Sequence, residues 1–123
     1  MAGGVSDGPS RQAAWQALSQ LFLDTQLDDR DIAAIATQLR ATGFSVDEIQ
    51  RIYEQEVAPA CWRNLEAVPG GAWAGFDADW LREAIERQAQ GRGGWPLVQR
   101  LRVHRWTRRS RPDWLRVREA LTR

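Results

Sequence analysis

The sequence of 123 residues contains no lysine and only one cysteine, one histidine and one tyrosine. Without lysine, Schiff-base and lysine-nucleophile chemistry are excluded. A single histidine excludes a metal centre built on several histidines, and a single cysteine cannot form a disulfide within the chain. No apolar run approaches the roughly 20 residues that a membrane-spanning helix needs. These absences remove several classes of enzyme, and we expect no cofactor, no metal and no membrane partner.

The first ten residues, MAGGVSDGPS, are small and polar and lack the charged-then-apolar pattern of a secretory leader. Together with the unpaired cysteine, this pattern predicts a reducing compartment, namely the cytoplasm. Residues 1–9 are expected to be disordered, because they are rich in glycine and have nothing to anchor them. Residues 10–123 are expected to form a single helical domain with a real core.

All 17 basic residues are arginine, and they are unevenly distributed along the chain. Residues 1–90 hold seven arginines and fourteen acids, whereas residues 91–123 hold ten arginines and two acids. The two parts therefore carry charges of −7 and +8, although the whole chain carries only +1. We interpret residues 10–90 as an acidic core and residues 91–123 as an arginine-rich helical tail packed on it. Such asymmetry is typical of a chain that meets a charged partner.

Apolar residues recur at helical spacing along most of the chain, which predicts an all-α fold. The strongest helix start is the capping box formed by Ser45 and Glu48. Pro59 interrupts the apolar stripe that follows, and a proline in a helix interior costs roughly 3 kcal/mol, so a kink or a restart is expected there. The sequence thus predicts a compact bundle of five to six short helices with a kink at Pro59 and a basic C-terminal helical tail.

Glu56 falls four positions after Ile52 and three after Tyr53, on the face that is otherwise apolar. A buried carboxylate is costly unless it is hydrogen-bonded or paired. We interpret Glu56 as a structural residue held by a tryptophan indole, an arginine or loop amides. The alternative is a catalytic acid, which would need a partner and a cleft. Cys61, on the inward stripe, is interpreted as a buried small hydrophobe.

Several acids cluster near the predicted start of the second helix. They lack the glycine and the terminal glutamate of a calcium loop, and aspartates at helix starts are favoured by the helix dipole. We therefore interpret them as caps and a solvated face rather than a metal site. An acidic face would also speed the capture of a basic protein. The candidate partner-binding residues are Asp24, Asp28, Asp29, Asp31, Glu54 and Glu66.

The tail combines arginines with tryptophans, a pattern typical of nucleic-acid binding, in which arginines neutralise phosphates and indoles stack on bases. The other interpretation is that the tail docks on the acidic core, because its tryptophans and leucines need burial and its helices are too short to be stable alone. We favour docking. The candidate nucleic-acid-binding residues are Arg100, Arg102, Arg105, Trp106, Arg108 and Arg109.

Five short motifs, taken together and in order, resemble a family of small, uncharacterised bacterial all-helical proteins. They are Trp15-x-Ala-Leu-Ser, Leu21-Phe-Leu-Asp-Thr, Asp31-Ile-x-x-Ile-Ala, Glu56-Val-Ala-Pro-x-Cys-x-x-Asn-Leu and Gly75-Phe-Asp-x-x-Trp-Leu, and they span about residues 13–85. The resemblance implies no activity and no catalytic residues. Chains of this size and style also resemble the immunity proteins of bacterial competition toxins, an analogy of type rather than of motif.

From these observations we predict a non-catalytic protein-binding domain. Its expected role is that of an immunity or inhibitor-type protein that neutralises a cognate bacterial toxin by direct binding. The alternative is a nucleic-acid-binding protein that uses the C-terminal arginine and tryptophan tail. An enzyme is the least favoured class, because the chain offers many acids without singling out a catalytic pair.

Overall fold

The computed structural model describes residues 8–23, 26–66, 77–91 and 96–123. Within these ranges every regular element is helical, which confirms the all-α prediction. The elements are α1 (Pro9–Ser19), a 3-10 turn (Gln20–Phe22), α2 (Asp29–Ala41), α3 (Val46–Ile52), a π-helical segment (Tyr53–Val57), α4 (Ala58–Glu66), α5 (Ala78–Gly91), α6 (Pro96–Thr107) and α7 (Arg111–Thr122). Residues 1–7, most of the segment expected to be disordered, lie outside the described ranges.

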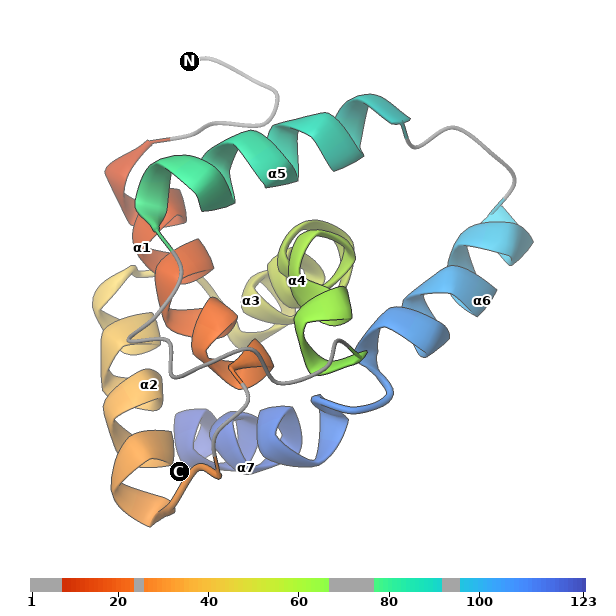
Figure 1. Cartoon of the computed structure of the whole chain (residues 1–123). Helices are drawn as coiled ribbons and strands as arrows, with labels where there is room; N and C mark the ends of the chain where they lie inside the picture. The colour runs from red at the N-terminus through yellow and green to blue at the C-terminus, as the bar shows by residue number, and fades with distance from the viewer. Residues whose placement is uncertain (1–7, 24–25, 67–76, 92–95) are drawn as a thin grey trace.

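One long helix forms the centre of the fold, because α3, the π segment and α4 follow one another without a break. Figure 1 shows this central helix nearly end-on, with α5 above it, α1 to its left, α7 below it and α6 to its right. Helix α2 lies farther out and packs on α1 and α7. Among the described residues, no helix is both long enough and apolar enough to cross a lipid bilayer.

The core lies between the central helix and the helices around it. Large apolar side chains at i, i+3 and i+4 spacing supply most of it, as the periodicity predicts. The largest side chains with almost no exposed surface are Trp15, Leu18, Phe22, Ile35, Leu39, Ile49, Ile52, Tyr53, Val57, Leu81, Ile85 and Val117. Burying each such side chain contributes about 1.5–3 kcal/mol, which makes this cluster the main source of stability.

The helix starts are fixed by short polar side chains. Asp28 accepts a hydrogen bond from the Asp31 amide at 2.9 Å, and the Asp31 carboxylate accepts one from the Asp28 amide at 3.0 Å. At the start of α3, Ser45 accepts from the Glu48 amide at 3.1 Å, which is one half of the predicted capping box. Gly43 closes the preceding turn at a φ of 83°, where a side chain would be strained.

The irregularity expected around Pro59 takes the form of the π-helical segment, which ends two residues before the proline. Its wider turn is closed by a hydrogen bond from the Ala58 amide to the Tyr53 carbonyl. In a regular α-helix the proline ring would clash with the carbonyl of Gln55. The π turn leaves room for that ring, so the chain stays helical through Pro59 instead of breaking there.

The tail docks on the first ninety residues through α7. Trp114 is buried and stacks on Tyr53 of the central helix, with ring centroids 4.9 Å apart and an interplanar angle of 22°. The Tyr53 hydroxyl shares a hydrogen bond of 2.6 Å with the Ser110 hydroxyl. The Arg40 guanidinium of α2 donates to the Ala120 carbonyl near the end of α7. The burial of the apolar side of α7 is therefore provided by α2 and the central helix.

Tyr53 makes stability at high pH a direct test of this docking. Burial raises the pKa of Tyr53 from 10.0 to about 12. Between these values the unfolded chain has lost the phenolic proton and the folded chain has kept it, so the unfolded state binds fewer protons. The free energy of unfolding should therefore fall by about 1.4 kcal/mol per pH unit from pH 10 to pH 12.

Denaturant titrations at stepped pH would measure this slope, and the absorbance of tyrosinate would report ionisation of the only tyrosine. Burial also raises the pKa of the Cys61 thiol, and this adds a loss of stability in the same direction. In the Tyr53→Phe variant, only ionisation of the Cys61 thiol should still lower the free energy of unfolding as the pH rises. Ionisation of Tyr53 near pH 10 in the folded protein would contradict the buried position.

Candidate functional site

Glu56, the one buried carboxylate among the described residues, is bound by two side chains of α1. The Trp15 indole N–H donates to Oε1 at 2.7 Å, and Arg11 Nε donates to the same oxygen at 3.0 Å. The second nitrogen of the Arg11 fork donates to Oε2. Both oxygens are thus satisfied by a guanidinium and an indole, the partners that the structural interpretation names. This geometry ties α1 to the central helix and supports a structural role for Glu56.

The acids predicted to bind a partner do different things in the fold. Asp28 and Asp31 cap α2, and the hydrogen bond from the Asp31 amide lowers the pKa of Asp28. Asp29 pairs with Arg116 of α7 at 2.8 Å. Glu54 accepts a hydrogen bond of 3.1 Å from Gln50 on its own helix. Asp24 and the side chain of Glu66 lie outside the described residues.

Metal binding finds no support in this arrangement. The described residues contain no group of three or more His, Cys, Asp or Glu side chains placed to hold a metal ion. Cys61, predicted to be a small buried hydrophobe, is buried in the core. His104 is exposed on α6. Burial keeps the Cys61 thiol protonated, because it raises the pKa of that group.

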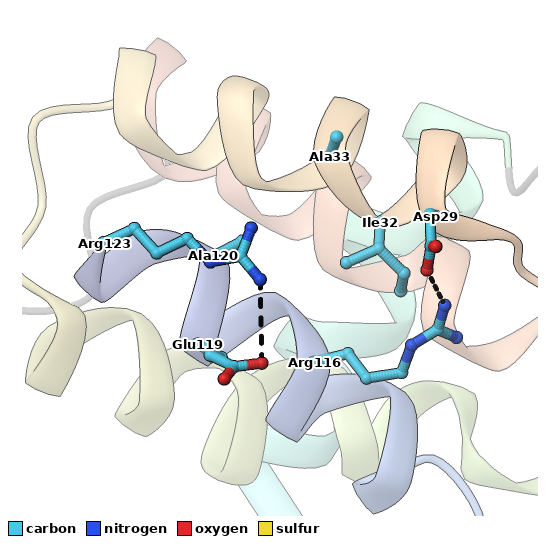
Figure 2. Close-up of a pocket in the computed structure, with 7 residues that line it drawn as sticks. All are labelled: Asp29, Ile32, Ala33, Arg116, Glu119, Ala120 and Arg123. Carbon is cyan, nitrogen blue, oxygen red and sulfur yellow. Dashed lines mark hydrogen bonds and ion pairs between the residues drawn. The ribbon is translucent and has the colours of Figure 1, made fainter.

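A cleft of about 250 Å³ lies between α2 and α7, and Figure 2 shows the side chains around it. Its apolar part comes from Ile32 and Ala33 of α2 and from Ala120 of α7. One ion pair, Asp29 with Arg116, stands at one end. A second, Glu119 with Arg123 at 3.8 Å, stands at the other end. The cleft therefore combines a small apolar patch with two pairs of opposite charges, and its lining is mostly polar.

Arg116 holds the first end of this cleft in place. Its guanidinium donates to the carbonyl of Leu27 at 3.0 Å, to Asp29 at 2.8 Å and to Asp113 at 3.2 Å. The hydrogen bond to Asp29 is the main reason that the pKa of Arg116 is raised. Asp29 is 87 residues away in the sequence. No local pattern in α7 signals this contact, so sequence reasoning missed Arg116 and the cleft.

The arginines predicted to bind nucleic acid lie on α6 and in the turn that follows it. Arg100, Arg102, Arg105, Arg108 and Arg109 are exposed. Arg105 lies over the ring of Trp62 of α4, with its guanidinium carbon 5.2 Å from the ring centroid, which is a cation–π contact.

The tryptophans of the tail are arranged differently from that prediction. Trp106 is half-buried and packs against the core, and Trp114 is buried on Tyr53. Trp95 lies outside the described residues. The two described indoles of the tail therefore take part in packing, Trp114 fully and Trp106 in part.

These features define a small protein that is helical throughout its described residues. Its buried carboxylate joins α1 to the central helix, and its cleft and the arginines of α6 lie at the surface. The chain belongs to the family described as Domain of unknown function (DUF7079), which matches residues 9–120. The match supports the predicted membership of a small uncharacterised family and extends over the tail. Comparison with curated proteins and with solved structures gives no match.

Proposed function

We propose that this chain is a non-catalytic protein-binding domain of the immunity or inhibitor type, which acts in the cytoplasm and neutralises a bacterial toxin by direct contact. The observation that supports it best is the cleft between α2 and α7. The cleft offers a small apolar patch between charged groups, which suits one apolar side chain of a protein partner with charged contacts around it.

The size of the cleft favours a protein partner over a small molecule. Its volume of about 250 Å³ is below the range of about 300–1,000 Å³ that small-molecule sites occupy. One aliphatic side chain from a partner would fill the space between the two ion pairs. The exposed carboxylate of Asp29 and the guanidinium of Arg123 would then offer a charged contact on either side.

The role of Glu56 also supports a binding protein. A catalytic acid needs an oxygen that can exchange a proton with a substrate. Here Arg11 and Trp15 donate to both carboxylate oxygens, so the group is committed to joining α1 and the central helix. An enzyme mechanism built on this carboxylate would have to break that junction.

The nucleic-acid alternative retains one favourable observation, namely the exposed arginines of α6. The other half of the pattern, in which indoles stack on bases, has less support, because Trp106 and Trp114 take part in packing. Phosphate contacts without stacking or base readout would give only weak, sequence-independent binding that falls steeply with salt.

A pair of alanines in α2 provides a matched test of the proposed function. Both Ala33 and Ala34 are exposed, but only Ala33 lines the cleft. Ala33→Arg should fill the cleft and weaken binding to the partner at least about tenfold, a typical effect at the centre of an interface. Ala34→Arg adds the same charge next to it and should bind as the wild-type protein does.

The tagged full chain and both variants would be used to purify the partner from cells of the native host. The isolated partner would then be titrated by calorimetry, and its toxicity would be measured in cells that co-express each form. Neutralisation lost with Ala33→Arg and kept with Ala34→Arg supports the proposal. A partner that both variants bind equally, or recovery of nucleic acid alone, would refute it.

A further inference from the structure

We propose that α6 carries a second docking surface, which binds an acidic segment of a partner protein. We name it the arginine face and define it as Arg100, Leu101, Arg102, Arg105 and Arg108. The proposal goes beyond the function proposed for the α2–α7 cleft, because it rests on other residues and on a helix that does not line that cleft.

The first observation is the concentration of one charge on this face. All four arginines of the arginine face are exposed. The sequence contains no acidic residue from position 92 to position 112. In contrast, Arg116 of α7, a half-buried arginine that lines the cleft, is paired with two acids. The arginine face thus presents concentrated positive charge, which attracts an anionic partner.

The second observation is an exposed leucine among these charges. Leu101 is 67% exposed, more than the other large apolar side chains of the described residues that reach the surface, Trp80 and Leu115. In sequence it lies between Arg100 and Arg102, one helical turn before Arg105 and seven residues before Arg108, which directly follows the end of α6. An apolar side chain ringed by arginines matches an interface with a central anchor and a charged rim.

The third observation concerns the length of the partner's acidic segment. Helix α6 has 12 residues, which corresponds to about 18 Å. A duplex nucleic acid presents phosphates along its backbone but no apolar side chain to place on Leu101. A short acidic segment with one apolar residue matches both the length and the chemistry of the arginine face.

The test uses a fluorescent peptide of glutamates that flank a single leucine, titrated with the full chain and followed by anisotropy. Arg100→Ser, Arg102→Ser and Arg108→Ser combined should weaken binding about tenfold, since each exposed charge pair contributes modestly. The matched control replaces three exposed arginines elsewhere, Arg30, Arg51 and Arg87, with serine. It makes the same change in net charge and should weaken binding less than about twofold.

Leucine replacements test the apolar part of the surface. Leu101→Ser should weaken binding about fivefold, because it removes the central anchor. Leu115, which is 52% exposed on α7, serves as the control, and Leu115→Ser should have no effect. Binding should also weaken as salt rises from about 0.05 to about 0.3 M, because screening shortens the reach of the arginine charges.

Several results would overturn the proposal. One is equal peptide binding by the two triple variants. Another is tighter binding of a duplex DNA than of the peptide, with the same arginines required, which would make the face a nucleic-acid surface. Self-association in sedimentation experiments that the Arg100, Arg102 and Arg108 replacements abolish would identify a second copy of the chain as the occupant. Ala33→Arg should leave peptide binding intact, so failure here is distinguishable from failure at the cleft.

Discussion

Replacing Glu56 by alanine should lower the free energy of unfolding by about 3–5 kcal/mol, the cost of breaking a buried ion pair by removing one partner. The carboxylate receives the Arg11 fork and the Trp15 indole in a buried position. Without it, a mostly buried guanidinium and an indole N–H would remain with no acceptor. Urea unfolding followed by circular dichroism measures this loss at neutral pH.

A double replacement separates the cost of an unpaired charge from the value of the pair. Arg11→Met together with Glu56→Met replaces both charged groups by apolar chains of similar length, a change that is often neutral or stabilising. We expect the double variant to be more stable than Glu56→Ala by at least about 2 kcal/mol. Equal stability of Glu56→Ala and the wild-type protein would contradict the role assigned to this carboxylate.

Trp114→Ala should be comparably destabilising, by about 3–5 kcal/mol, because it leaves a large cavity against Tyr53 where α7 joins the central helix. The side chain is 2% exposed and stacks on the tyrosine ring. Calorimetric melting compared with that of the wild-type protein would measure the effect. Leu115→Ala, at the neighbouring exposed position, is the control and should change stability by less than about 0.5 kcal/mol.

Trp114→Phe isolates the polar atom of this side chain. The indole N–H of Trp114 is buried and has no hydrogen-bond partner among the described residues. An unsatisfied buried donor costs about 1–3 kcal/mol. Phenylalanine removes this donor, and the gain offsets part of the packing energy that the smaller ring loses. We therefore expect Trp114→Phe to cost far less than Trp114→Ala. Equal losses would show that a phenyl ring recovers none of the packing that the indole makes against Tyr53.

The fold could be predicted from the sequence where its cause is local. The apolar spacing of Ile32, Ile35 and Leu39 predicts α2 and the side that it buries, and both are observed. Either Asp28 or Asp29 was expected to cap the same helix, and Asp28 caps it. The pairing of Glu56 with an indole and an arginine was also predictable in kind, because a carboxylate on an apolar face needs donors.

The positions of the surface sites could not be predicted in the same way. The cleft depends on Arg116 meeting Asp29 and Leu27, and this contact joins the two ends of the chain. The tail's arginines and tryptophans looked like one binding pattern in the sequence. The fold separates them, since Trp114 faces the core while Arg108 faces solvent. Spacing alone cannot show which side of a short helix a neighbour will cover.

The π-helical segment has a consequence for how changes in chain length would act on this protein. A π turn holds one residue more than an α turn, so deleting one residue from 53–57 would restore an ordinary α-helix. Because a π turn and an α turn with one residue fewer cover nearly the same rotation and rise, α4 beyond the deletion would keep its orientation relative to α3. Tyr53 lies at the start of the segment and bonds to Ser110, whereas Glu56 lies near its end and bonds to Arg11. The extra residue therefore sets only the angle between these two side chains, so in a shortened chain the central helix would keep its direction while the contacts of Tyr53 with α7 and of Glu56 with α1 could not both keep their geometry.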